Sequence, residues 1–373
     1  MPTLHGIDMP FTILTLLLLG LGLICLFSAS YAAAYAYQDQ DSTYFVVRQL
    51  AFAVLGLIAM FWLAYHDYRF LKWFSYLILL ASLGMLATRF VIPSIWATIN
   101  DATRWINVFG LITFQPSELA KVGIIGTFAS IASSMGPKKM RRWWVIFFPF
   151  GLLLGLTVGL IYTQPHFSAI IIIAVIGVAI MVAGGANILV GGLTAGVGGA
   201  GLLYMMTRTG HSSSRLDVWL DPFSDFLGAG WQAAQSFIAI GSGGFWGLGL
   251  GQGRQKHLFL PEPANDFIFS VICEKMGFVG ATLIILTFAA LVWRGFYIAR
   301  HAADRFGALL AVGVTMQIAF QAIVNLFVVC GLFPVTGAAL PFFSAGGTAL
   351  FLLLAEVGVV LSVSRRMKDT EDQ

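Results

Sequence analysis

One carboxylate in this chain stands where it could do acid–base chemistry, at the end of the longest polar segment. Asp266 follows the segment Leu260 to Asn265 and directly precedes an apolar stretch that begins at Phe267. A carboxylate in this position can accept a proton as a general base. Asp266 or Asn265 can equally cap the helix that is expected from Phe267 onward. Both interpretations of Asp266 stay open at the level of sequence.

A second group of charged residues suits the binding of phosphate. Arg104 is followed by Trp105, and Glu118 and Lys121 lie three residues apart in a helix expected from Pro116. That spacing places Glu118 and Lys121 on one helix face, with Lys121 about 7.5 Å below the helix start. Arg binds phosphate through two hydrogen bonds and Lys binds it as a point charge, so Arg104 and Lys121 predict a pyrophosphate site. The alternatives are ordinary helix-start signals at Pro116 and Glu118 and a Lys121 that extends up to the membrane surface.

The composition places these residues in a membrane protein. The chain is 58% hydrophobic and only 10% charged, whereas soluble domains carry roughly 25% charged residues. A membrane-spanning helix needs about 20 mostly apolar residues. We therefore predict an all-α integral membrane protein in which residues 1–373 form one polytopic domain with ten transmembrane helices. The ten apolar stretches run approximately over 10–34, 46–65, 71–91, 116–134, 144–162, 167–184, 187–206, 267–293, 307–329 and 346–364.

Basic residues set the expected orientation. An even number of spans puts both termini on one side, and short loops such as 135–143 and the tail after Arg365 are dense in Lys and Arg. The positive-inside rule therefore places both termini in the cytoplasm and the long loop 207–266, between helices 7 and 8, outside it. The net charge of +4 reflects this topology and indicates no nucleic-acid partner.

The long outer loop contains two features of interest. The stretch from Gly230 to Ile240 is apolar but too short to span a bilayer, which predicts a re-entrant or interfacial helix. The glycine-rich run from Gly241 to Gly253 lacks the Gly-Lys-Ser/Thr ending of a P-loop and the preceding strand of a dinucleotide site. It is either a flexible turn or a backbone-lined floor that admits a bulky substrate.

Several separated motifs in this order resemble the SEDS family of membrane proteins, that is FtsW, RodA and SpoVE. The likeness covers nearly the whole chain, and the segment Gly251 to Lys256 is more similar to the FtsW and SpoVE branch. The motifs are Arg104-Trp105-Ile106, Gln115 to Lys121, Gln164-Pro165, Gly230 to Ser236, Leu260-Pro261-Glu262, Asp266 to Phe269, Pro334 to Gly337 and Leu340-Pro341-Phe342.

The resemblance implies a peptidoglycan glycosyltransferase of the bacterial cytoplasmic (inner) membrane. Such enzymes polymerise lipid II into glycan strands at the outer face of that membrane during division, elongation or sporulation, beside a class B penicillin-binding protein that acts as transpeptidase. The family's catalytic carboxylate corresponds to Asp266. The residues that we predict to bind the substrate are Arg104, Trp105, Glu118, Lys121, Gln232 and Glu274.

Four residues depart from the family pattern and leave details of the substrate groove open. Asn265 replaces a threonine before the aspartate, and Lys275 replaces the second acid of a pair that begins with Glu274. His166 stands where an aspartate follows Gln-Pro, and Ala345 replaces a tyrosine in a glycine-rich motif. A divalent cation, Mg or Mn, stays open as a cofactor, and no sequence feature indicates an organic cofactor.

The expected partners are the lipid II substrate, membrane lipid and the penicillin-binding protein. The resemblance implies that the outer faces of the eighth and ninth helices, with their loops, dock a penicillin-binding protein with a single span. Membrane helices associate through small residues, and one strip of them that could serve for docking consists of Gly307, Ala308, Ala311 and Gly313. Two other functions remain: a lipid II flippase, which would often show inverted repeats, and a non-catalytic scaffold for a penicillin-binding protein.

The topology is testable by labelling. We expect a single cysteine introduced at Ser213 to react with a membrane-impermeant thiol reagent in whole cells, and one at Ser134 to react only after lysis. The background would lack Cys25, Cys273 and Cys330. Labelling in intact cells at Ser134 but not at Ser213 would reverse the orientation.

Overall fold

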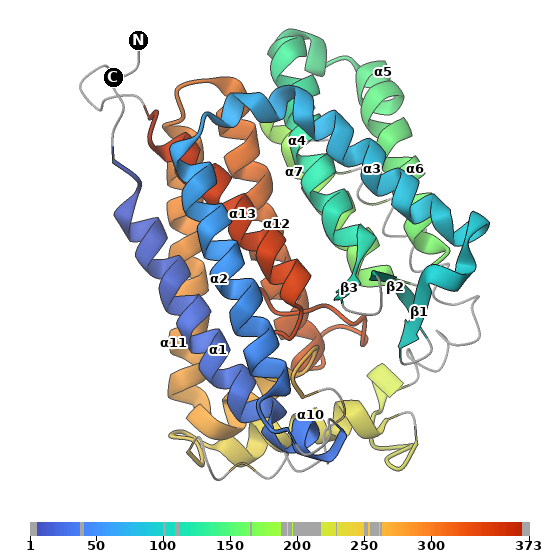
Figure 1. Ribbon diagram of the computed structural model, residues 1–373, viewed down its shortest axis with the longest axis vertical. Helices are drawn as coiled ribbons and strands as arrows, with labels where there is room; N and C mark the ends of the chain where they lie inside the picture. The colour runs from blue at the N-terminus through green and yellow to red at the C-terminus, as the bar shows by residue number, and fades with distance from the viewer. Residues whose placement is uncertain are drawn as a thin grey trace.

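The structure is a computed structural model of the 373-residue chain (Figure 1). It describes residues 6–37, 41–99, 102–108, 112–164, 166–187, 192, 196, 218–228, 230–249, 253, 261 and 263–367.

Long apolar helices dominate the described part of the chain. Eight of them are long and apolar enough to cross a membrane, and α7 is a shorter apolar helix. Nine of the ten predicted stretches therefore form helices, while the stretch 187–206 lies outside the described residues except for 187, 192 and 196. The helices are α1 (Met9–Tyr37), α2 (Tyr44–Tyr65), α3 (Leu71–Val91), α4 (Pro116–Met140), α5 (Trp143–Val145), α6 (Leu152–Tyr162), α7 (Phe167–Ala183), α10 (Trp231–Gly243), α11 (Ile268–Arg300), α12 (Arg305–Val329) and α13 (Gly347–Ser364), with one-turn segments η1 (Tyr68–Phe70) and η2 (Pro93–Ile95) and the π-helix η3 (Ile146–Gly151) between α5 and α6.

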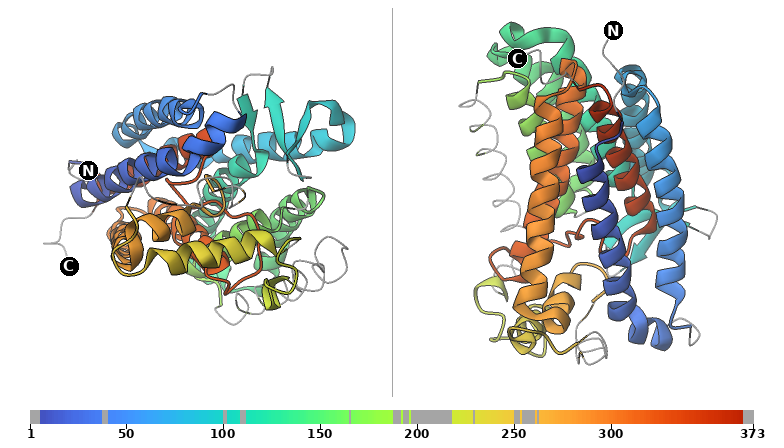
Figure 2. Two further views of the ribbon diagram at one scale, coloured as in Figure 1. Left: turned by 90° about the horizontal axis from the view of Figure 1, so that it is seen from below. Right: turned by 90° about the vertical axis from the view of Figure 1, so that its left-hand side faces the viewer.

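The long helices stand upright in one bundle, and α10 lies across its lower end (Figures 1 and 2). We call the opposite end, which carries Lys138, Lys139, Arg141 and Arg142, the basic end. Five tryptophans stand exposed on helix ends near it, and such aromatic belts mark a membrane–water boundary. These tryptophans are Trp62, Trp73, Trp143, Trp144 and Trp293.

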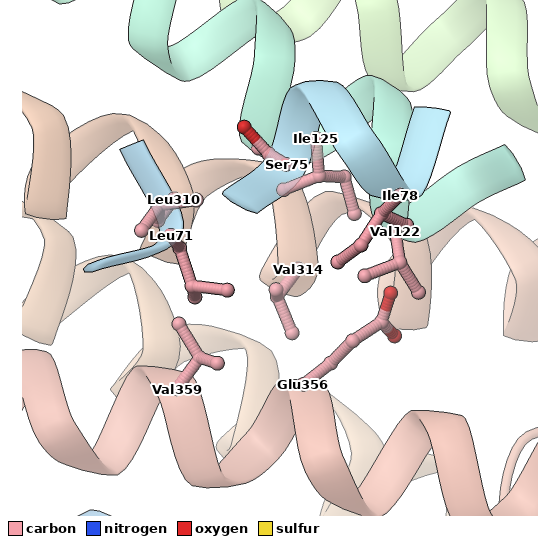
Figure 3. A pocket seen from close by; sticks show the side chains of 10 residues that line it. Leu71, Ser75, Ile78, Val122, Ile125, Leu310, Val314, Glu356 and Val359 are labelled. Carbon is pink, nitrogen blue, oxygen red and sulfur yellow. The ribbon is translucent and has the colours of Figure 1, made fainter. Parts of the chain in front are cut away.

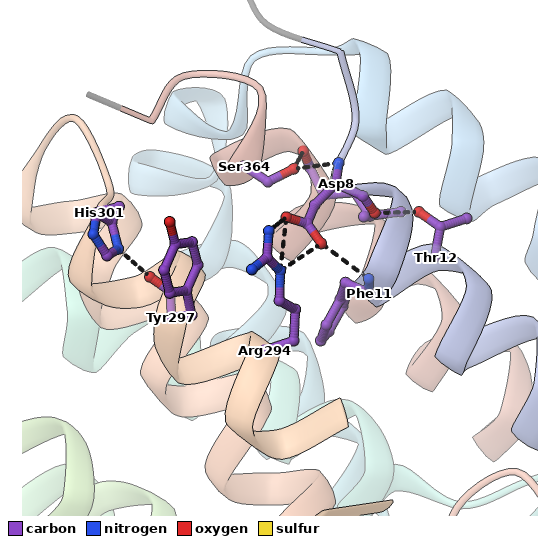
Figure 4. Close-up of polar contacts among 8 residues, drawn as sticks. Asp8, Phe11, Thr12, Arg294, Tyr297, His301 and Ser364 are labelled. Carbon is purple, nitrogen blue, oxygen red and sulfur yellow. Dashed lines mark hydrogen bonds and ion pairs between the residues drawn. The ribbon is translucent and has the colours of Figure 1, made fainter. Parts of the chain in front are cut away.

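An ion pair joins the first and later helices at the basic end (Figure 4). Asp8 accepts two hydrogen bonds from Arg294 Nε at 3.1 Å and one from Nη2 at 2.7 Å. The Asp8 carboxylate also accepts the Phe11 amide, as an N-cap of α1, and its own amide donates to Ser364 Oγ at 3.1 Å. The start of α1 and the end of α13 therefore lie together, as an even number of crossings requires.

The outer segment 92–115 differs from the all-α expectation, because it forms a small antiparallel sheet. Its strands are β1 (Trp96–Ile99), β2 (Ala102–Val108) and β3 (Ile112–Phe114), in the order β1-β2-β3. The strands are rich in the Thr, Ile, Val, Trp and Phe residues that favour pleated structure. Arg89 at the end of α3 donates to the Thr103 carbonyl at 2.9 Å, which ties the sheet to the bundle. We call this end of the molecule the sheet end.

The glycine-rich run packs against a break in α11 and is not a free turn. α11 is interrupted at Gly277, where φ is 63°. Leu248 and Gly249 donate their amides to the carbonyls of Glu274 and Lys275, both at 2.9 Å, and Phe278 donates to Gly244 at 2.9 Å. A side chain on Gly277 would overlap this backbone. The close approach that glycine permits is used by the protein's own main chain, in what we call the glycine clasp.

The prediction that the strip of small residues docks a partner is wrong, because the strip faces the interior of the bundle. Gly307, Ala311 and Gly313 are buried. A Cβ on Gly307 would lie 2.9 Å from the Tyr68 ring, and one on Gly313 would lie 2.8 Å from Ile125. The small residues therefore let α12 approach its own neighbours within the bundle.

The Asp8–Arg294 pair predicts a stability effect. The Asp8 side chain is 2% exposed and that of Arg294 is 29% exposed. Asp8→Ala removes the charge-assisted hydrogen bonds and the helix cap, so we expect a loss of roughly 1–3 kcal/mol and a lower thermal midpoint in detergent. Asp8→Asn keeps the cap and should lose less. Asp41→Ala, at an exposed turn, is the control, and equal midpoints for Asp8→Ala and this control would contradict the prediction.

Candidate active site

Asp266 and Arg104 meet at Gly337, although they come from distant parts of the chain. Arg104 Nη1 and Asp266 Oδ2 each lie 3.3 Å from the position that a Cβ on Gly337 would occupy. Gly337 has a φ of +77°, in the region that favours glycine. The loop between α12 and α13 therefore brings the predicted base and the predicted phosphate-binding arginine to one point, and a side chain at Gly337 would crowd both.

Asp266 lies just before the first helical residues of α11. α11 begins at Ile268, and its N-cap residue is Phe267, which has no side-chain cap. Asp266 therefore precedes the N-cap position, in the turn that leads into the helix. Its main-chain carbonyl accepts a hydrogen bond from Asn325 Nδ2 at 2.8 Å. The fold fixes the backbone of Asp266 and leaves its carboxylate beside Arg104.

The loop from Gly331 to Gly346 is irregular backbone that the protein satisfies with buried side chains. Ser344 Oγ donates to the Asn265 carbonyl at 2.7 Å and accepts the Leu340 amide at 2.7 Å. The Ala345 amide donates to the Ala264 carbonyl at 2.8 Å. Asn265 and Ala345, two of the departures from the family pattern, thus contribute main-chain atoms here.

The predicted Lys121–Glu118 pair is present. Lys121 Nζ lies 2.8 Å from Glu118 Oε2, with side chains 2% and 15% exposed. Lys121 also donates to Gln321 Oε1 at 3.1 Å. The ammonium is therefore buried among partners and does not extend to the surface. The pair lies in the first turns of α4, at the sheet end.

His166 is a neutral neighbour of this charged group. Its Nδ1 lies 3.2 Å from Gln115 Nε2 and 3.3 Å from Ser117 Oγ. Burial, together with the positive charges of Arg104 and Lys121, holds the pKa of His166 well below its usual value. The imidazole that replaces the family's aspartate therefore adds no charge near neutral pH, where an aspartate would add a negative one.

The other predicted binding residues lie apart from this cluster. Trp105 pairs with Ala97 in the sheet, and the register shifts between Ala97 and Thr98, so that Arg104 is an extra residue between the paired residues Thr103 and Trp105. Gln232 on α10 donates to the Pro261 carbonyl at 3.5 Å. Glu274 is buried in α11 beside the glycine clasp, where a Cβ on Gly253 would lie 2.7 Å from its Oε2. Lys275 donates to the Ser28 hydroxyl at 2.6 Å and so links α11 to α1.

A small cavity lies deeper in the bundle, between α3, α4, α12 and α13 (Figure 3). Its volume is about 30 Å³, room for one or two water molecules. Its walls are apolar apart from Ser75 and the buried Glu356, whose Oε2 accepts a hydrogen bond from Gln317 Nε2 at 2.6 Å. The cavity is too small for a lipid or sugar substrate.

Sequence reasoning missed Gln321, Asn325 and Ser344, which hold the site together. The signal for the first two was present, since amide residues recur every fourth position along an otherwise apolar helix at Gln317, Gln321 and Asn325. Polar residues within a membrane helix face the protein interior and are often functional. Ser344 lies in a loop, and its contacts across 79 positions of sequence to Asn265 leave no local pattern.

Upright apolar helices with a charged cluster at one end define an integral membrane protein whose site lies near a membrane surface. The chain belongs to the FtsW/RodA/SpoVE family, described as cell cycle proteins, whose family model matches residues 9–369. It is therefore a multi-pass membrane protein of the SEDS family.

Curated relatives match along nearly their whole length. Stage V sporulation protein E of Bacillus subtilis (strain 168) is 40% identical over 365 residues, which are 96% of this chain and 97% of that protein. A "Probable peptidoglycan glycosyltransferase FtsW" of Geobacter sp. (strain M18) is 37% identical over 371 residues, 99% of each chain. These names agree with the FtsW and SpoVE branch predicted from sequence.

Solved structures share the fold. One, described as "Structural coordination of polymerization and crosslinking by a peptidoglycan synthase complex", has a TM-score of 0.78 at 28% identity and covers 97% of this chain and 99% of its own. The rod shape determining protein RodA of Thermus thermophilus has a TM-score of 0.69 at 28% identity and covers 97% and 98%.

The geometry predicts how the anion site responds to substitution. Lys121→Ala or Arg104→Ala should weaken binding of a lipid pyrophosphate by roughly tenfold or more, because each removes a charge-assisted hydrogen-bond donor. Lys121→Glu should be worse, since it places a second acid beside Glu118. The measurement is binding of undecaprenyl pyrophosphate to the purified protein. Wild-type affinity in Lys121→Ala would make Lys121 a purely structural residue.

Proposed function

We propose that this protein is a peptidoglycan glycosyltransferase that polymerises lipid II, with Asp266 as its catalytic base. The observation that carries the proposal is the meeting of the Asp266 carboxylate and the Arg104 guanidinium at Gly337. The second cation, Lys121, lies in the same end of the bundle. The similarity to FtsW and SpoVE along the whole chain supports the reaction type.

The reaction follows from these groups. The hydroxyl oxygen of the acceptor sugar attacks the anomeric carbon of the donor while Asp266 accepts the hydroxyl proton. The bond from that carbon to the pyrophosphate oxygen breaks, and both bonding electrons leave with the lipid pyrophosphate. Arg104 and Lys121 stabilise the negative charge that grows on this leaving group. Asp266 then releases its proton to solvent, and the sugar chain is one unit longer.

Arg104 has a second effect through its position. The guanidinium and the Asp266 carboxylate both lie next to Gly337, so a leaving group held by Arg104 would lie near the proposed base. The neutral His166 adds no negative charge that would oppose an incoming pyrophosphate. Glu118 holds Lys121 without leaving the buried ammonium uncompensated.

A divalent cation, Mg or Mn, stays a proposal. Among the described residues, no three His, Cys, Asp or Glu side chains come together as a metal site would require. Magnesium at phosphate sites takes one or two carboxylates together with substrate oxygens, so Asp266 could hold it only jointly with the pyrophosphate. Such an ion would add positive charge at the leaving group.

We also propose ten crossings of the bacterial cytoplasmic membrane within one domain, with both termini in the cytoplasm. α7 ends beside Pro137 of the basic end, where a Cβ on Gly185 would lie 3.2 Å from it. α11 begins at the sheet end, beside Asn325. The prediction of ten helices assigns the crossing between them to the apolar stretch 187–206, most of which lies outside the described residues. The basic end then faces the cytoplasm.

The proposed protein partner is a class B penicillin-binding protein with a single span. One similar structure belongs to a complex that couples polymerisation to crosslinking. Because the strip of small residues on α12 is buried, docking on α11 and α12 would use their exposed apolar residues instead. These include Phe278, Leu286, Ile323 and Phe327.

The decisive test is Asp266→Asn, which keeps the size of the side chain and removes the proton acceptor. Loss of a general base typically costs 10²–10⁴-fold in rate, so we expect almost no glycan from lipid II with the partner-bound variant. Asp221→Asn, at an exposed outer turn, is the matched control and should make product like the wild type. The readout is glycan-chain formation by equal amounts of folded protein.

Two results would oppose the proposal. Equal product from Asp266→Asn and wild type would remove Asp266 as the base. Absence of product from the wild type with its partner would favour the flippase or scaffold function.

A further inference from the structure

α12 carries a row of three amide side chains into the bundle. Gln317, Gln321 and Asn325 are each four residues apart, so they share one helix face. Gln317 and Asn325 are buried. Amides within a membrane helix are costly unless they are hydrogen-bonded inside the protein. Each of the three donates to a different partner, and two of those partners belong to the candidate active site.

Asn325 connects the main chain of Asp266 to the loop beside it. Its Nδ2 donates to the Asp266 carbonyl at 2.8 Å and to the Ala338 carbonyl at 2.7 Å. A side-chain amide has two N–H donors, and both are used here. One buried side chain therefore fixes the distance between the residue that carries the base and the loop that contains Gly337.

Gln321 connects the anion-binding lysine to the same loop. Its Oε1 accepts a hydrogen bond from Lys121 Nζ at 3.1 Å, and its Nε2 donates to the Ala339 carbonyl at 3.0 Å. The Lys121 ammonium has three N–H donors, and Glu118 and Gln321 accept two of them. Gln321 thus orients the ammonium, whose third N–H is the one that the proposed function assigns to a phosphoryl oxygen.

We propose that Gln321 and Asn325 are positioning residues that hold Lys121 and Asp266 in one register through the loop Gly337 to Ala339. Neither needs to touch the substrate. Gln321 acts on binding of the pyrophosphate through Lys121, and Asn325 acts on proton transfer through Asp266. The proposal rests on the proposed function. It adds the residues that set the distance between the proposed base, Asp266, and the proposed anion-binding residue, Lys121.

Amides suit this role better than charged residues. A neutral amide offers a donor and an acceptor on one rigid plane, which is what Gln321 uses toward the loop and the lysine. A carboxylate at the same place would bind Lys121 more strongly and compete with the incoming pyrophosphate. A carboxylate in place of Asn325 would face two carbonyl oxygens without a donor, which is unfavourable in a buried site.

The row supplies its own control. Gln317 lies one turn from Gln321 and has the same chemistry, but its Nε2 donates to Glu356 Oε2 at 2.6 Å. That contact joins α12 to α13, and Glu356 lines the small cavity shown in Figure 3. A purely structural role for the row predicts the same consequence for all three amides. The positioning role predicts different consequences for each.

The experiment compares Gln321→Met, Asn325→Leu and Gln317→Met in the full chain bound to its partner. Gln321→Met should weaken binding of undecaprenyl pyrophosphate and raise KM for lipid II by about tenfold, as loss of one hydrogen bond to a charged group does, with kcat changed less. Asn325→Leu should lower kcat on the order of a hundredfold, the effect of a misplaced catalytic group, with KM changed less. Gln317→Met should leave both parameters near the wild type.

A double variant separates positioning from folding. In a Lys121→Ala background, Gln321→Met should cause no further loss of undecaprenyl pyrophosphate binding, because residues that act as one unit are not additive. A general structural role would give the same extra loss in both backgrounds. If Asn325→Leu fails to fold, Asn325→Ser keeps one donor and should still lower kcat by roughly tenfold.

Each contrary result leads to a different conclusion. Equal effects of the three substitutions on kcat and KM, or additive losses in the Lys121→Ala background, would overturn the positioning role. A wild-type protein that binds undecaprenyl pyrophosphate but makes no glycan would contradict the proposed function. In that case the binding measurements would still decide the role of Gln321.

Discussion

The site depends on a loop of irregular backbone whose main-chain N–H and C=O groups need hydrogen-bond partners inside a membrane protein. The loop between α12 and α13 exposes main-chain groups at the sheet end, and the bilayer offers them no water. The protein provides side chains instead: Asn325 and Gln321 from α12, Ser344 from the loop itself, and Gln49 from α2, which binds the Ser344 carbonyl and the Gly346 amide at 3.2 and 3.1 Å. Because the same loop contains Gly337, these hydrogen bonds also fix the residue beside which Arg104 and Asp266 lie.

The charged side chains at the sheet end lie near side chains of opposite charge. Two cations, Arg104 and Lys121, each have an acid nearby, so neither charge is buried without compensation. The pairings differ in their consequences. Lys121 is buried with Glu118, and Arg104 shares the space beside Gly337 with the base. In the proposed function, a pyrophosphate would meet donors that the fold already holds in place, which is the condition under which electrostatic stabilisation of a leaving group is most effective.

The sequence predicted what periodicity and composition can reveal, namely the membrane helices and the Glu118–Lys121 pair three residues apart. It did not predict the sheet at 96–114, because short alternating strands in an outer segment carry a weak signal beside long apolar runs. The inward direction of Gly307 and Gly313 was missed for another reason. Small residues favour close packing of helices, but the pattern does not say whether the neighbour is the same chain or a partner. The convergence of Asp266, Arg104 and Gly337 arises from the tertiary structure, and no local sequence pattern indicates it.

Two independent supports act on the helix that follows Asp266. Asn325 holds the residue's carbonyl from α12, while the glycine clasp binds the carbonyls of Glu274 and Lys275 from the outside. The break at Gly277 makes the second support possible, because it frees main-chain groups of α11 that a regular helix would use internally. The first turns of α11, up to the break at Gly277, are therefore held by hydrogen bonds from two different parts of the chain. Asp266, the proposed base, therefore lies at the start of a segment that hydrogen bonds from two other parts of the chain hold in place.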